Sequence, residues 1–309
     1  MRVRVGAGHG ARGRCQCSGF GSGGSFGTGE DGRLGHGSES KEVVPRLIAH
    51  LEQVVAVAAG SEHSMALSAE GQVFTWGYGG NGRLGHGDSN SRLVPTRVES
   101  LVGGSGIAAG NDHSLAVAGG TVYSWGYGRS GQLGLGDTNN RDVPTAVPGL
   151  MGVGAVEAGG SHSLALDRGG TLRSWGHGVA LGPGRLRGSW SSRIRYIPTV
   201  VAGLRHVVDM AGGLSHTIAA TLEGHVYAWG SRWATGPTTP GGRVASGLEG
   251  KVVVQVAAGA EHCMAVTQAG RLLTWGKGEY GQLGHGRREQ VLQVPRAEVV
   301  VGAGAVVGG

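Results

Sequence analysis

Two landmarks repeat along the chain, and they restrict the fold more than any other feature. The first is Trp followed by Gly, recurring at intervals of 49, 50, 54 and 46 residues, and the second is His, 12 or 13 residues before each Trp. The tryptophans are Trp76, Trp125, Trp175, Trp229 and Trp275, and the histidines are His63, His113, His162, His216 and His262. Phe26-Gly27 occupies the same position 50 residues before Trp76. A fixed period of this length indicates one small unit used repeatedly. We number the units one to six, by Phe26 and then by each Trp in turn.

Each unit is predicted to form four short strands. In unit two, the apolar run Val54–Ala59 is followed by the alternating run His63–Ser68, a turn at Ala69-Glu70-Gly71, and the returning strand Val73–Trp76. A last edge strand is expected around Pro95, where the missing N–H of proline is tolerated. No unit has helical spacing over the length that a helix needs. Four antiparallel strands per period predict an all-β fold, a β-propeller of about six readable four-stranded blades.

Composition agrees with a tightly packed repeat fold. Glycine accounts for 65 of 309 residues, yet 39% of the residues are hydrophobic and the glycines recur at fixed positions, which argues against disorder and collagen. No apolar stretch is long enough for a transmembrane helix. The net charge of +6 is only modestly basic and gives weak support for a nucleic-acid partner.

These units resemble the repeats of the regulator of chromosome condensation family. Val57–Leu67 and Ile107–Val117 match that family's small-small-Gly-x-x-His-small motif, and Trp76–Gly85 and Trp125–Gly134 match its Trp-Gly-x-Gly-x-x-Gly-x-Leu-Gly motif. The same repeat type is shared with β-lactamase-inhibitor protein and the plant UV-B photoreceptor. The resemblance implies a propeller, usually of seven blades. Because only six units are readable here, the ring is expected to be incomplete or closed by a degenerate half-blade.

The resemblance implies several functions. Family members that act as guanine-nucleotide exchange factors for small Ras-like GTPases use one propeller face and a protruding β-wedge. The interval from Trp175 to Pro198 is 23 residues against the usual 19, so a wedge-sized insertion is missing. We therefore expect a protein-interaction scaffold, with exchange activity on a small GTPase as its specific form. A chromatin-binding module is the alternative. Light sensing is disfavoured because no Trp stands two residues before any repeat His.

No catalytic, cofactor-binding or metal site is predicted. The five repeat histidines occupy one equivalent position in separate units, so a recurring structural hydrogen bond explains them better than ligation does. The Gly-x-Gly-x-x-Gly strings such as Gly77–Gly82 lack the following helix that a phosphate-binding fingerprint needs. No nucleophile and base pair is identifiable. The chain is therefore not expected to be an enzyme beyond an exchange factor.

One segment, Pro183–Tyr196, is a candidate partner-binding loop. Unit four lacks the Gly-x-Leu-Gly pattern in this part of the chain. The segment contains four arginines and no acidic residue. Arginine and tryptophan are typical of interaction surfaces. The candidate residues are Arg185, Arg187, Trp190, Arg193 and Arg195. The alternative is a solvated basic loop.

The domain limits follow from the repeats. Residues 1–25 form a Gly- and Arg-rich degenerate N-terminal segment, 26–296 the propeller, and 297–309 a short tail or the start of a truncated blade. Whether the N-terminal segment is an organelle transit peptide or a degenerate half-blade stays open. Three cysteines, Cys15, Cys17 and Cys263, are too few for a disulfide framework, so an intracellular location, cytoplasmic or nuclear, is expected. No membrane association is predicted, and the oligomeric state is left open.

Overall fold

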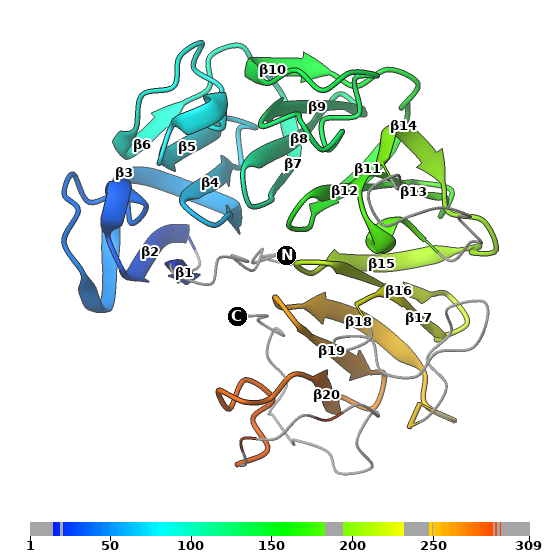
Figure 1. The fold of residues 1–309 in the computed structure, drawn as a ribbon. Coiled ribbons are helices and arrows are strands. Elements are labelled where there is room, and N and C mark those ends of the chain that lie inside the picture. The colour runs from blue at the N-terminus through cyan, green and yellow to red at the C-terminus, as the bar shows by residue number, and fades with distance from the viewer. Residues whose placement is uncertain are drawn as a thin grey trace.

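The fold is built from antiparallel strands. The computed structural model describes residues 15–18, 21–182, 194–231, 247–248, 250–286, 288 and 291 (Figure 1). Within these ranges the regular structure is β-strand plus three short 3-10 helices, η1 (Glu30–Gly32), η2 (Gly80–Gly82) and η3 (Val179–Leu181). The predicted all-β class is confirmed.

The strands form five sheets. The first has the order β1 (Cys15–Ser18), β2 (Gly21–Gly27), β3 (Glu42–Ala59), β4 (His63–Ser68), β5 (Val73–Gly77) and β6 (Arg92–Arg97). The second contains β7 (Gly104–Ala109), β8 (His113–Ala118), β9 (Thr121–Gly126) and β10 (Arg141–Ala146). The third contains β11 (Val153–Ala158), β12 (His162–Asp167), β13 (Leu172–His177) and β14 (Ile194–Val200). The last two are β15 (Val207–Gly212), β16 (His216–Thr221) and β17 (Val226–Gly230), then β18 (Val253–Ala258), β19 (His262–Thr267) and β20 (Leu272–Gly276).

The prediction of about six separate four-stranded blades is wrong, for two reasons. First, β3 runs without interruption from the outer strand of unit one, around Pro45, into the inner strand of unit two, so both units share a six-stranded sheet. Second, units five and six have three described strands each, because the positions of their outer strands fall largely outside the described residues. A single bridge, Gly276 to Val291, marks that position in unit six. The boundary predicted at residue 26 stays a prediction, although β1 and most of β2 precede it.

The sheets follow one another around a common centre (Figure 1). Their inner strands contact in sequence, β3 with β7, β7 with β11, β11 with β15 and β15 with β18. Within unit two the strands predicted at His63–Ser68 and Val73–Trp76 are found as β4 and β5, joined by a turn in which Gly71 has a φ of 79°. This positive φ is why the turn needs glycine. The arrangement is that of a propeller.

The hydrophobic core lies between neighbouring sheets. Trp125 packs with Met65, Leu67 and Val73 of the first sheet, and Trp229 packs with Leu164 and other residues of the third. Four of the repeat tryptophans have no exposed surface and Trp229 has 6%. Buried aromatic surface of this size is a main source of stability between the blades.

Strand direction gives the propeller two different faces. One face carries the turns after the inner strands, such as 60–62 and 110–112, together with the long loops that follow each Trp-Gly. We call this the loop face. The opposite face carries the short turns at 69–71 and its equivalents, and we call it the hairpin face.

Candidate functional site

The repeat histidines join neighbouring blades. His63 Nε2 lies 2.9 Å from Ser114 Oγ, His113 Nε2 lies 2.9 Å from Ser163 Oγ, and His162 Nε2 lies 3.0 Å from Thr217 Oγ1. Each hydroxyl donates its one proton elsewhere, since Ser114 Oγ, for example, donates to the Arg83 carbonyl at 2.9 Å. The imidazole must therefore donate through Nε2–H, which fixes the tautomer.

Burial keeps the imidazoles of His63, His113 and His262 neutral. It lowers the pKa of His113 to about 3, with a further contribution from the Arg83 guanidinium, and it lowers the pKa of His63 and His262 in the same direction. A neutral, fully enclosed imidazole bonded to a neighbouring blade is a structural group. The structural role proposed for the repeat histidines fits this geometry.

The glycine three residues before each His is required by close packing. A Cβ on Gly60 would lie 2.4 Å from His63 Cε1 and 2.5 Å from the Gly110 carbonyl oxygen of the next blade. Real Cβ atoms do not approach other atoms so closely, and both neighbours are held in place. The recurring glycine therefore lets the inner ends of adjacent blades meet.

The tryptophans reach the loop of the preceding unit. Trp76 Nε1 donates to the Arg33 carbonyl at 3.0 Å, Trp175 Nε1 to the Gln132 carbonyl at 2.8 Å, and Trp229 Nε1 to the Ala180 carbonyl at 2.6 Å. These three loops of the loop face are thus held by the next blade. The recurring Trp fills the space between blades, and in these three units its indole N–H also positions the preceding loop.

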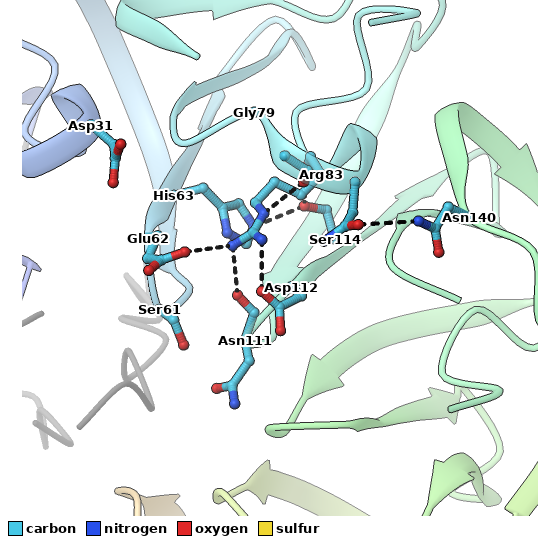
Figure 2. A network of polar contacts seen from close by, with 12 residues as sticks. Asp31, Ser61, Glu62, His63, Gly79, Arg83, Asn111, Asp112, Ser114 and Asn140 are labelled. Carbon is cyan, nitrogen blue, oxygen red and sulfur yellow. Dashed lines mark hydrogen bonds and ion pairs between the residues drawn. The ribbon is translucent and has the colours of Figure 1, made fainter. Parts of the chain in front are cut away.

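A buried arginine organises the loop face between the first two sheets (Figure 2). Arg83 has 2% exposed surface, and its guanidinium pairs with Glu62 Oε2 at 3.2 Å and with Asp112 Oδ1 at 2.7 Å. Its Nε donates to the Gly80 carbonyl at 3.0 Å, and its guanidinium carbon lies 4.7 Å from the centroid of the Tyr78 ring. Glu62 and Asp112 are each 41% exposed, so the partner carboxylates face solvent while the cation does not.

This network was not predicted from the sequence. Arg33 fills the equivalent position in unit one, with its Nε donating to the Glu30 carbonyl at 2.8 Å, and Gln132 fills it in unit three. The signal was present in the Gly-Arg-Leu-Gly strings and in the acids that directly precede His63 and His113. The arginine of the Gly-Arg-Leu-Gly string and the acids before His63 and His113 are not adjacent in the chain. Their ion pairs therefore could not be predicted without the fold.

The predicted partner-binding loop is only partly described. Arg185, Arg187, Trp190 and Arg193 lie outside the described residues. Arg195 lies on β14, where its Nη1 donates to Ser174 Oγ at 3.1 Å and to the Leu181 carbonyl at 2.7 Å. Burial of this head group lowers the pKa of Arg195. Partner binding by these five residues stays a prediction.

The described residues contain neither a metal-binding cluster nor a membrane-spanning helix. In those ranges no group of three or more His, Cys, Asp or Glu side chains could hold a metal ion. The described part of the chain also contains no helix with the length and apolar character needed to span a membrane.

Three solved structures are similar to this chain. Human WBSCR16 is 26% identical, with a TM-score of 0.82 over 97% of this chain and 83% of that one. Yeast RCC1 (Prp20) bound to Kap60 is 23% identical, with a TM-score of 0.77 over 95% of this chain and 74% of that one. Prp20p from Saccharomyces cerevisiae is 23% identical, with a TM-score of 0.70 over 94% and 76%. At these identities the two yeast structures support the fold alone.

The family model described as the regulator of chromosome condensation (RCC1) repeat matches residues 25–67, 70–117, 119–166 and 269–300, more than half of the chain. A second model of the same description matches residues 54–83, 155–179, 207–231 and 253–282. These matches cover all six units and carry the inter-blade histidines and tryptophans described above. With the repeats, the sheets and the family models in agreement, the chain belongs to the RCC1 repeat family.

Proposed function

We propose that this chain is a protein-binding propeller whose partner contacts the loop face around Arg83. The observation that carries the proposal is the pair of half-exposed carboxylates, Glu62 and Asp112, held by one buried guanidinium. Two carboxylates against one cation leave an excess negative charge facing solvent. Because Arg83 is enclosed and bonded on several sides, the acceptors are held in place before binding, which lowers the entropic cost of association.

The composition around this pair suits protein recognition. Tyr78 is 37% exposed beside the network, and Asn140 Nδ2 donates to Asn81 Oδ1 at 3.2 Å across the neighbouring loops. Tyrosine, asparagine and fixed carboxylates give amphipathic contact area with directional acceptors. Such a surface fits a partner that presents Lys, Arg or backbone N–H groups.

A specific form of this function is nucleotide exchange on a small Ras-like GTPase. Binding properties of Prp20p to Gsp1p and histones are described, and yeast RCC1 binds Kap60 in its crystal structure. A carboxylate such as Asp112 that approaches a bound nucleotide would repel its phosphates and compete for a basic side chain that holds them. The proposal assigns binding rather than turnover of a substrate to this chain.

Release of mant-GDP from a panel of small GTPases tests the exchange form. We expect wild-type protein to accelerate release from at least one GTPase, and Asp112→Asn to reduce that acceleration by tenfold or more. Glu70→Gln, on the hairpin face, is the control and should retain full acceleration. If the wild type accelerates mant-GDP release from no GTPase of the panel, the exchange function is rejected. The chain is then a protein-binding scaffold without exchange activity.

Chromatin association is the second candidate, and the described binding of Prp20p to histones favours it. A basic histone segment would suit the acidic pair on the loop face, whereas DNA would suit the net charge of +6. Binding to histone peptides that is lost in the Glu62→Gln, Asp112→Asn double variant would support the histone form. An intracellular location, cytoplasmic or nuclear, belongs to the same proposal. Cys263 is buried and forms no disulfide.

A further inference from the structure

The long loops are held at their roots by one recurring arrangement. In five of the six units the residue before the Trp or Phe carries a hydroxyl that donates to a leucine carbonyl in the following loop, whereas unit five has Ala228 there. The pairs are Ser25 with Leu34 at 2.6 Å, and Thr75 with Leu84, Ser124 with Leu133 and Thr274 with Leu283 at 2.7 Å each. In three units a histidine two residues beyond the leucine then binds the same hydroxyl. His36, His86 and His285 do so at 3.0, 3.0 and 2.8 Å.

Unit four keeps the hydroxyl and the leucine but lacks the histidine. Ser174 Oγ donates to the Leu181 carbonyl at 2.5 Å, as in the other units. The loop around Leu181 is shortened, and the residue two beyond it is Pro183. Arg195 supplies the missing donor, because its Nη1 lies 3.1 Å from Ser174 Oγ and 2.7 Å from the Leu181 carbonyl. One guanidinium nitrogen thus binds both members of the pair.

The same position behaves differently in the neighbouring units. Arg92 and Arg141 stand three residues before the outer-strand proline, as Arg195 does. They turn toward their own loops and pair with Asp88 Oδ2 at 2.8 Å and Asp137 Oδ2 at 2.7 Å, with 25% of each arginine exposed. In unit four the residue four before the arginine is Ser191, which offers no carboxylate. The loss of both the histidine and the aspartate accounts for the inward direction of Arg195.

We infer that Arg195 is a clasp at the base of segment 183–193, a positioning residue and not one of its partner contacts. The chain leaves the described blade at Gly182 and returns at Ile194, and the bond from Arg195 to Leu181 ties these two ends together. The clasp fixes the distance between the two described flanks, Leu181 and Arg195. This inference goes beyond the partner site proposed around Arg83, and it removes Arg195 from the arginines that the sequence predicts to contact a partner.

The test compares variants of the full chain by thermal unfolding and by hydrogen exchange. Arg195→Ala should lower the Tm by about 3–8 °C, since it leaves a buried hydroxyl and carbonyl without their charged donor. It should also raise amide exchange at least tenfold in 174–182 and 194–197, with no change around the equivalent Thr75 and Leu84. Arg195→Lys should recover most of both effects, because one nitrogen makes both bonds. Arg141→Ala is the matched control and should shift the Tm by less than about 2 °C.

Binding to a fluorescein-labelled decaglutamate peptide at low salt separates this inference from the predicted partner binding by Arg185, Arg187 and Arg193. The triple variant Arg185→Ala, Arg187→Ala, Arg193→Ala should lose peptide binding at an unchanged Tm. Unchanged binding by the triple variant would reject segment 183–193 as a partner site. The role of Arg195 as a clasp would still be decided by the Tm and hydrogen-exchange measurements. An Arg195→Ala protein with wild-type Tm and exchange would overturn the clasp, above all if it lost peptide binding as the triple variant does.

Discussion

Acidification should weaken the propeller through its enclosed histidines. His113 has its pKa lowered to about 3 in the folded protein, against about 6.5 in an unfolded chain. As the pH falls below 6.5, the unfolded state therefore takes up a proton that the folded state does not, and stability is lost down to the folded pKa. Each pH unit in this window costs about 1.4 kcal/mol, so His113 alone costs about 2 kcal/mol at pH 5.

The window between pH 6.5 and 5 isolates the histidines. The pKa values of Asp88, Asp137 and Asp167 are lowered, so these carboxylates lose their stabilising effect only as the pH falls through the region below their ordinary value near 3.8. His63 and His262 shift in the same direction as His113, so the wild type should lose more than 2 kcal/mol in total.

Urea unfolding at pH 7.5 and pH 5 measures the effect. His113→Gln keeps an N–H donor for Ser163 but cannot titrate, so the loss of stability between the two pH values should shrink by about 2 kcal/mol. Leu115→Ala, a buried variant with no titrating group, is the control and should lower stability equally at both pH values. If His113→Gln shows the same pH dependence as the wild type, the imidazole is protonated or exposed in the folded protein and the assignment of its bond to Ser163 is wrong.

Three further changes test the packing between blades. Trp125→Ala should cost about 3–5 kcal/mol of unfolding free energy, whereas Tyr280→Ala, 74% exposed, should cost less than about 0.5 kcal/mol; equal losses would place the indole at the surface. Arg83→Ala should lower the free energy of unfolding by about 2–3 kcal/mol, because it removes a buried cation from two carboxylates. Arg92→Ala should lower it by no more than about 1 kcal/mol, because that pair is more exposed. A larger loss for Arg92→Ala than for Arg83→Ala would contradict the stabilising role of the buried pair. Gly60→Ala should cost at least about 2 kcal/mol, and Gly106→Ala, whose Cβ would meet only Val117 at 3.6 Å, should be near neutral; a neutral Gly60→Ala would refute the close approach of the blades.

The local structure of each unit was predictable from the sequence. Alternating residues at His63–Ser68 and the glycine turn at 69–71 specify a hairpin within a few residues, so β4 and β5 were placed correctly. The repeated glycine before each histidine also indicated a tight approach of the backbone. These signals are local, and they recur often enough for the period itself to identify the propeller.

The contacts between units could not be predicted in the same way. Ser114 receives the bond from His63 and gives its own to Arg83, and these partners stand 51 and 31 residues away. Ser191 stands four residues before Arg195 where Asp137 stands before Arg141, but this difference does not by itself show that Arg195 bonds to Ser174 and Leu181 while Arg141 pairs with its own loop. The fusion of units one and two through β3 likewise depends on pairing with β2, not on any local pattern.

The most direct test of a partner on the loop face compares the proteins that copurify with three forms of the full chain. The forms are the wild type, the double variant Glu62→Gln, Asp112→Asn, and the hairpin-face control Glu70→Gln, each assayed at a temperature well below its own Tm. The double variant replaces only the two carboxylate charges that Arg83 holds in place. We predict that it loses the partners that the wild type and the control retain. Retention of the same partners by the double variant, or their equal loss from the control, would contradict a partner-binding role for the loop face.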